Sequence, residues 1–316
     1  MEVLVVGNTA YVDDDFCTKA FPGDHVQVVA ADDARRDESS PHASWKELLQ
    51  HLDQAYEFDR VVYLSNYLTP HTDTVGDIEL LRSVFRACMG RRVQLLYVAG
   101  PAAAEDAVDA TGQTGKGIIA RAANDLCRHY AAREGIQTKI LRAPFLYTAS
   151  AALEDPFLAP LFDACSTGSV ALQGAEDAAF PLLCAEELAV LVRRIFDSWD
   201  ATFETLDVAD SFNHTAGDVG EALKALFPGL SVAYGESAGY TLPTSDVVRV
   251  RYGWFQRYDL LRDLSTIQAR WDAGRARKVN PLRAAIDRIQ MRTLPIKCLE
   301  TGAAWVLFEV LEHLFS

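Results

Sequence analysis

The sequence predicts an α/β fold in which a parallel sheet is covered by helices on both faces. Short, continuous runs of β-branched and other apolar residues alternate with longer segments whose apolar residues recur at helical spacing. Continuous apolar runs are typical of strands that are buried on both faces. The first run begins at the second residue. This favours a doubly wound sheet of the nucleotide-binding type over other layered α/β folds.

The expected elements follow one another in a regular order. A polar stretch over residues 32–41 separates the first two strands from the rest of the sheet. The strands are expected at residues 2–7, 25–30, 60–64, 92–98 and 137–141, and the helices from about Asp14 and at 44–57, 76–89 and 118–135.

Composition limits the classes of function. The 316 residues are 49% apolar and 23% charged, which is typical of a globular protein of one or two domains. The net charge of −14 argues against general nucleic-acid binding. Six widely spaced cysteines and seven histidines show no metal-binding pattern, so we expect buried thiols in a cytoplasmic protein and no metal site. The start does not resemble a signal peptide, and no run of 18 uncharged apolar residues occurs.

The order of these landmarks resembles the extended short-chain dehydrogenase/reductase family, the NAD-dependent sugar epimerases and dehydratases. The resemblance covers about residues 1–265. It implies a Rossmann-like core over 1–150, a smaller substrate-type subdomain over 151–268 with segments returning to the core, and a helical tail over 269–316. The segments that carry it are VLVVGNTAYV, VVAADD, FDRVVYLSNYL, VQLLYVAG, ARAANDLCRHYAAREGIQTKILRAPFLY, AAFPLLCAEELAVLV and RYGWFQRYDLLRDL.

In this family a G-x-x-G-x-x-G turn holds the dinucleotide pyrophosphate at a helix N-terminus. The matching positions here are Gly7, Ala10 and Asp13, followed by Asp14 and Asp15. A pyrophosphate about 4 Å from one carboxylate meets a repulsion of about 4 kcal/mol at an effective dielectric of 20. We therefore expect no cofactor, or only weakly bound NAD(P). The alternative, an ordinary acidic helix cap with the cofactor bound elsewhere on the turn, stays open.

Two acids at the end of the second expected strand are the other candidate cofactor ligands. Asp32 and Asp33 could accept hydrogen bonds from ribose hydroxyls, which would favour NAD over NADP. They could equally well be solvated loop acids, and Arg35 and Arg36 could instead suit a 2′-phosphate.

The family's catalytic residues are a tyrosine, a lysine four positions later and a nearby serine or threonine. The resemblance aligns Lys116 with the tyrosine and Ala120 with the lysine, and none of the seven lysines has a tyrosine four residues before it. Residues 98–101, Val-Ala-Gly-Pro, lack the hydroxyl. Lys116 is thus the one suspected catalytic residue, and a solvated lysine at a helix start is the simpler explanation.

These absences predict a pseudoenzyme that acts in binding, scaffolding or regulation. The alternative is an NAD-dependent nucleotide-sugar epimerase, dehydratase or reductase with non-standard residues. The tail is basic over 269–292 and strongly apolar over 293–315, so it could pack on the domain, form a homodimer or bind a membrane-associated partner. Similar degenerate modules occur in membrane-bound proteins of bacterial exopolysaccharide synthesis (Pel-type) and signalling, which implies such a parent protein as one candidate.

Overall fold

The computed structural model describes residues 1–30, 43–44, 58–65, 75–101, 115–149, 155–209, 211–236 and 247–279. The chain divides into two compact units, Met1–Gln268 and Ala269–Ser316. The expected helix at 44–57 lies almost entirely outside the described residues.

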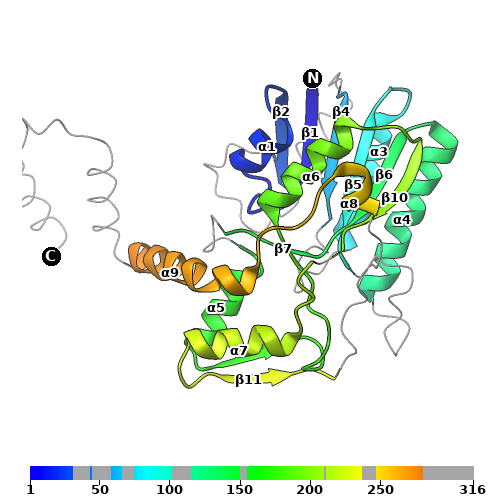
Figure 1. The fold of residues 1–316 in the computed structure, drawn as a ribbon. Coiled ribbons are helices and arrows are strands. Elements are labelled where there is room, and N and C mark those ends of the chain that lie inside the picture. The colour runs from blue at the N-terminus through cyan, green and yellow to red at the C-terminus, as the bar shows by residue number, and fades with distance from the viewer. Residues whose placement is uncertain are drawn as a thin grey trace, which may run out of the picture. The chain divides into compact units, whose positions relative to one another are not determined.

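The central sheet has seven strands in the order β10-β6-β5-β4-β1-β2-β3, and every neighbouring pair is parallel (Figure 1). This confirms the predicted α/β class with a Rossmann-like, doubly wound sheet, because the chain winds outward from β1 in both directions. The five predicted strands differ from the observed ones by at most two residues at either end. The strands are β1 (Glu2–Gly7), β2 (His25–Ala30), β3 (Ala43–Ser44), β4 (Arg60–Leu64), β5 (Gln94–Ala99), β6 (Gln137–Arg142) and β10 (Phe203–Asp207).

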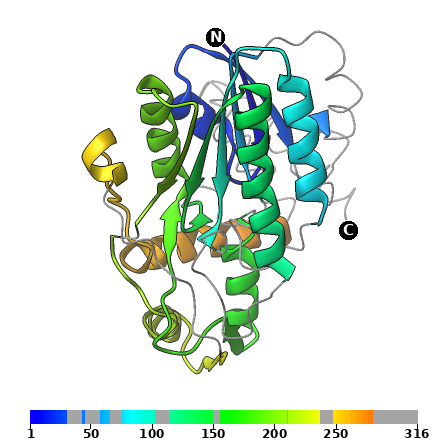
Figure 2. The same ribbon diagram turned by 90° about the vertical axis from the view of Figure 1, so that its right-hand side faces the viewer.

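Helices cover both faces of this sheet (Figures 1 and 2). Successive side chains of a strand point to opposite faces, and the buried residues accordingly form two cores. Val3 and Val5 of β1 pack with α1 and α6, whereas Leu4 and Val6 pack with α3 and α4. The four helices are α1 (Asp14–Ala20), α3 (Val75–Cys88), α4 (Gly115–Glu134) and α6 (Ala185–Asp197).

A smaller group of elements lies below the carboxyl ends of the strands in the view of Figure 1. Two short parallel pairs of strands belong to it, together with two helices that contact the second pair. The elements are β7 (Phe145–Tyr147) with β9 (Leu182–Cys184), β8 (Ser169–Leu172) with β11 (Ser231–Tyr234), α5 (Leu158–Ser166) and α7 (Ala216–Leu226). Along the chain, α6 and β10 lie between elements of this group, but α6 packs on the main sheet and β10 is one of its strands. The proposed boundary near residue 150 stays a prediction.

The described chain ends in two helices, α8 (Val247–Tyr252) and α9 (Leu260–Val279). The helix predicted from residue 269 therefore begins nine residues earlier, at Leu260, and residues 280–316 lie outside the described part. No helix within the described residues is long and apolar enough to span a membrane.

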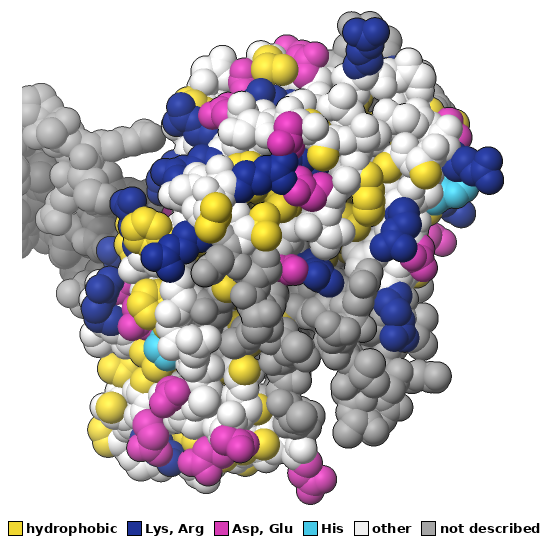
Figure 3. Space-filling view, turned by 45° about the vertical axis from the view of Figure 1, so that its right-hand side comes forward, with side chains coloured by type: hydrophobic (Ala, Val, Ile, Leu, Met, Phe, Trp, Pro, Cys, Tyr) yellow, Lys and Arg dark blue, Asp and Glu magenta, His cyan; other side chains and the backbone are white. Residues whose placement is uncertain are grey.

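The negative charge is unevenly distributed. Asp and Glu side chains gather at the lower end of Figure 3, where Figure 1 places α7. This helix carries the exposed Asp218 and Glu221, and Glu236 follows the neighbouring strand β11. At the opposite edge of the sheet, where the strands begin, the side chains include the arginines Arg60 and Arg92.

Candidate functional site at the carboxyl ends of the strands

The carboxyl ends of β1 and β4 meet where the strand order reverses. From β1 the sheet continues to β2 on one side and to β4 on the other. In open parallel sheets, ligands bind outside the strand ends at such a switch point. Gly7, Leu64 and Ala99 end β1, β4 and β5 there, so this edge is the candidate site.

Gly7 is required by the close approach of two strands. A Cβ atom on Gly7 would lie 3.0 Å from the Cβ of Leu64 and 3.5 Å from Cγ1 of Val12. The first distance is shorter than real Cβ contacts normally allow. Gly7 therefore lets the turn after β1 pack against the end of β4.

Asn8 folds the turn that follows. Its Oδ1 accepts a hydrogen bond from the backbone N–H of Ala10 at 2.9 Å, and its backbone oxygen accepts from Tyr11 and Val12 at 2.9 and 3.1 Å. An asparagine commonly stabilises a turn in this way. Ala10 is 8% exposed, so its methyl group is largely covered by protein.

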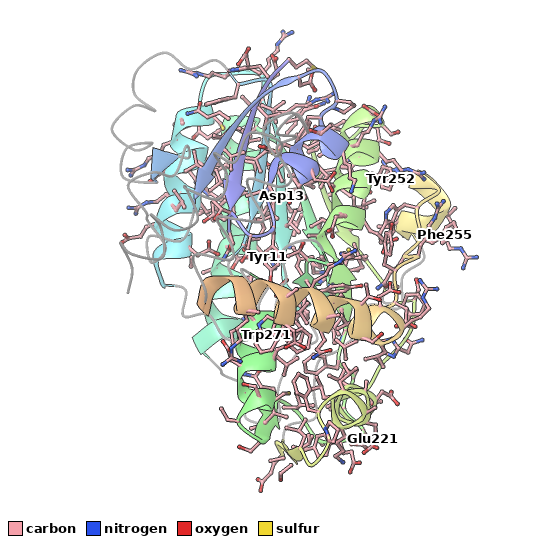
Figure 4. The ribbon with its side chains drawn as sticks, turned by 90° about the vertical axis from the view of Figure 1, so that its left-hand side faces the viewer. Tyr11, Asp13, Glu221, Tyr252, Phe255 and Trp271 are labelled. Carbon is pink, nitrogen blue, oxygen red and sulfur yellow. The ribbon has the colours of Figure 1, made fainter. Side chains whose placement is uncertain are left out.

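Tyr11 connects this turn to the smaller group of elements. Its side chain is buried, and its hydroxyl donates a hydrogen bond to the backbone oxygen of Leu146 in β7 at 3.0 Å. Figure 4 shows Tyr11 and Asp13 close to β1 and α1. No role was predicted for Tyr11 from the sequence, although a tyrosine in an otherwise apolar part of the turn indicates a buried hydroxyl that needs a hydrogen-bond partner.

Asp13 caps α1. Its backbone is extended (φ −80°, ψ 179°), and its Oδ1 accepts a hydrogen bond from the N–H of Phe16 at 2.8 Å. This is standard N-cap geometry. In the next turn the Asp15 carboxylate pairs with Lys19. The carboxylate for which the sequence predicted repulsion is thus directed at the first turn of its own helix, as in an ordinary acidic helix cap.

A buried polar cluster lies at the end of β4. The hydroxyls of Tyr63 and Ser65 donate to the two carboxylate oxygens of Asp77 in α3, at 2.5 and 3.0 Å. Burial, followed by the charge of Asp77, raises the pKa of the Tyr63 phenol well above its usual value. The phenol therefore stays protonated and acts as a donor. These residues tie the end of β4 to α3, and sequence reasoning did not single them out.

The structure brings three of the predicted cofactor residues, Gly7, Ala10 and Asp13, into one turn. Asp32 and Asp33 lie outside the described residues. Lys116 is in the first turn of α4, but its side chain is outside the described part. Within the described residues, no group of three or more His, Cys, Asp or Glu side chains is placed to hold a metal ion.

No protein-family model matches the chain, and no curated protein sequence matches it either. Solved structures do match. MoeE5 in complex with UDP-glucose and NAD superposes with a TM-score of 0.68 at 16% identity, over 87% of this chain and 100% of that one. A UDP-N-acetylglucosamine 4-epimerase from Bacillus cereus gives 0.60 at 14% identity, over 84% and 95%. A short-chain dehydrogenase/reductase superfamily protein from Agrobacterium tumefaciens with bound NAD gives 0.63 at 13%, over 87% and 99%.

The chain has the short-chain dehydrogenase/reductase fold. Our expectation of no cofactor, or only weakly bound NAD(P), is contradicted, because MoeE5 and the Agrobacterium protein have this fold and hold NAD. The physical basis of the error is the orientation of Asp13. The expectation assumed a carboxylate facing a phosphate, whereas Asp13 accepts a hydrogen bond from Phe16 within α1.

Proposed function

We propose that the chain binds NAD over the turn from Gly7 to Asp13 and acts on a nucleotide-activated sugar. The observation that carries the proposal is the geometry of this turn. It sits at the switch point of a short-chain dehydrogenase/reductase fold, and its acid is engaged as a helix cap. The neighbours add support, since MoeE5 holds both UDP-glucose and NAD, and the Bacillus cereus protein is a UDP-N-acetylglucosamine epimerase.

The residues of the turn fit a dinucleotide. Gly7 permits close packing of the turn, which a dinucleotide crossing it requires. Lys19 offsets one of the neighbouring carboxylates by pairing with Asp15. NAD, when bound, supplies a hydride acceptor. This chain would hold and orient it, and Lys116 in α4 is the candidate for moving a proton in place of the family's tyrosine and lysine.

A second candidate function is a module that binds its ligands without turnover. The observation that favours it is the sequence itself, in which no lysine follows a tyrosine by four positions and residues 98–101 carry no hydroxyl. Such a module would regulate a larger assembly, and bacterial exopolysaccharide synthesis is the candidate setting.

Binding of NAD is tested by calorimetry on the full chain and on Asp13→Asn. Asparagine keeps the helix cap but removes the charge. We expect saturable NAD binding to the parent protein, and affinity that is unchanged or severalfold tighter in Asp13→Asn, because any remaining repulsion is relieved. The matched control is Asp125→Asn on the exposed side of α4, which should leave the affinity unchanged. Absence of NAD binding to both the parent and Asp13→Asn would contradict the proposal.

Turnover separates the two candidate functions. The protein is incubated with NAD and UDP-glucose, UDP-N-acetylglucosamine or dTDP-glucose, and the products are separated by chromatography. Turnover that is lost in Lys116→Ala but kept in Lys224→Ala, an exposed lysine of α7, supports the enzyme. Binding of NAD and of a nucleotide sugar without product supports the module.

A further inference from the structure

A second pocket opens at the opposite edge of the sheet. It encloses about 350 Å³ and is lined by the first residues of three strands, Arg60 of β4, Gln94 of β5 and Gln137 of β6. This volume is within the range of small-molecule sites. Strands of five or six residues rise about 3.3 Å per residue, so the pocket lies roughly 15–20 Å from the switch point. It is therefore separate from the crevice proposed for NAD.

Two arginines in its wall have unused hydrogen-bond donors. Nε of Arg60 is buried and has no hydrogen-bond partner among the described residues. The nearest acid to its guanidinium is Asp24 at 3.8 Å, which is beyond hydrogen-bond distance. Arg92 is exposed and makes no hydrogen bond or ion pair with any part of the chain that the structure describes. A guanidinium offers five N–H donors in a fixed fork that matches a carboxylate.

Two acids also line the pocket. The Asp59 carboxylate accepts a hydrogen bond from the backbone N–H of Glu2 at 2.9 Å. Asp197 lies 3.6 Å from Arg193, one helical turn earlier, and its side chain is 57% exposed. Two guanidinium groups and the amides of Gln94 and Gln137 bring more donors to the wall than these two carboxylates bring acceptors, which favours an anion over a cation.

One side of the pocket is aromatic. Phe196 and Trp199 stack with ring centroids 5.2 Å apart and an interplanar angle of 22°. The guanidinium of Arg60 lies 5.2 Å from the centre of the Phe196 ring. Phe196 is buried, whereas Trp199 is only half-buried and presents part of its ring to the pocket. Nζ of Lys139 also lies over the Trp199 ring, 5.1 Å from its centre. A flat apolar group in the pocket therefore packs against the accessible edge of Trp199.

We propose that this pocket is an accessory site for a small organic carboxylate with a flat apolar body. The carboxylate pairs with Arg60 and Arg92, and the body lies against Trp199. The amides of Gln94 and Gln137 provide further hydrogen bonds. The inference does not depend on the proposed NAD function, because it uses the other end of the strands.

The test is calorimetric titration of the full chain with benzoate, and with acetate and inorganic phosphate at matched ionic strength. We expect saturable benzoate binding that is tighter than binding of either other anion. Arg92→Gln should weaken it about tenfold, since a hydrogen bond to a charged group is lost. Gln137→Ala should weaken it less. The matched control is Arg262→Gln, an exposed arginine of α9, which should not change the affinity.

Arg92 and Gln137 are both exposed, so their variants should fold, and an unchanged thermal unfolding curve without ligand verifies this. Three results would overturn the proposal: no saturable binding of benzoate, equal affinity of the parent and Arg92→Gln, or phosphate binding as tightly as benzoate.

Discussion

The hydroxyl of Tyr11 donates a hydrogen bond to the backbone oxygen of Leu146, 3.0 Å away and 135 residues later in the chain. Both residues are buried. Tyr11 belongs to the turn after β1, and Leu146 belongs to β7 in the smaller group of elements. This hydrogen bond therefore connects the turn proposed to hold NAD with the smaller group.

Tyr11→Phe removes this bond and leaves the ring in place. A buried carbonyl then lacks its partner, which costs about 1–2 kcal/mol of unfolding free energy. Urea unfolding measures the loss, and NAD affinity should fall with it, because the turn is less firmly positioned. Tyr258→Phe, at a tyrosine that is 49% exposed, is the control. Equal stability of Tyr11→Phe and the parent would show that the bond contributes nothing.

Gly7→Ala should destabilise the protein by about 1–3 kcal/mol, because the new methyl group lies 3.0 Å from the Cβ of Leu64 in a packed core. A double-mutant cycle with Leu64→Gly tests the cause. Removing that Cβ is destabilising by itself, but it should make the added cost of Gly7→Ala close to zero. Additive effects of the two substitutions would mean that the methyl group meets a different obstacle.

Five of the seven strands of the sheet were predictable because apolar residues dominate them, and a run such as RVVYL or EVLVVG is typical of a buried strand. The role of Asp13 was not predictable. One rotamer of its side chain caps α1 and another would face a ligand, and the sequence does not determine which one is adopted. The pocket at the amino edge was also hidden. It joins residues 60, 92, 137 and 199, which only the sheet order brings together.

The role of Lys139 in the core was likewise not predictable from the sequence. The segment QTKIL was predicted to be a strand, but no role was predicted for its lysine, which is fully buried. Its Nζ lies 3.0 Å from Glu204, and it donates to Asp200 and to the Tyr252 hydroxyl, each at 3.1 Å. These partners come from segments at least 61 residues away. The ammonium therefore joins β6, β10 and α8.

Lys139→Met should destabilise the protein by about 2–4 kcal/mol, because breaking a buried ion pair leaves the other charge poorly compensated. Arg251 also pairs with Glu204. Because it still compensates this carboxylate in Lys139→Met, we expect a loss of unfolding free energy near the lower end of this range. Adding Glu204→Gln should restore part of the stability. Lys224→Met, at an exposed lysine of α7, is the control and should change little. Urea unfolding of the four proteins checks the expectation.

Burial lowers the pKa of Lys139, but the hydrogen bond with Tyr252, the ion pair with Glu204 and the hydrogen bond with Asp200 outweigh it and raise the pKa above the usual 10.5. A cation whose pKa is raised on folding stabilises fully below the unfolded-state pKa and loses that contribution as the pH rises through the folded-state value. The difference in stability between the parent and Lys139→Met should therefore be constant near neutral pH and shrink only above about 10.5. A difference that shrinks near neutral pH would mean that Lys139 is already neutral there.

Asp155 gives the fold a pH dependence in the acidic range. Its carboxyl group is fully buried, and it accepts hydrogen bonds from the N–H groups of Thr148, Phe157 and Leu158 at 2.6, 2.8 and 2.6 Å. Burial raises the pKa from 3.8 to about 7, although the three hydrogen bonds oppose the rise. The folded protein thus binds this proton more tightly than the unfolded chain does.

Between pH 3.8 and about 7 the folded state then holds more protons at Asp155 than the unfolded state. Its contribution to stability should fall as the pH rises through this window, by up to about 1.4 kcal/mol per pH unit, and level off above it. Urea unfolding of the parent and of Asp155→Asn across the window isolates the effect, because an amide does not titrate. The stability of the parent relative to Asp155→Asn should decrease as the pH rises. The control is Asp177→Asn, at an exposed acid, relative to which the stability of the parent should stay nearly constant. A relative stability that instead rises with pH would show that the three N–H groups stabilise the carboxylate more than burial disfavours it.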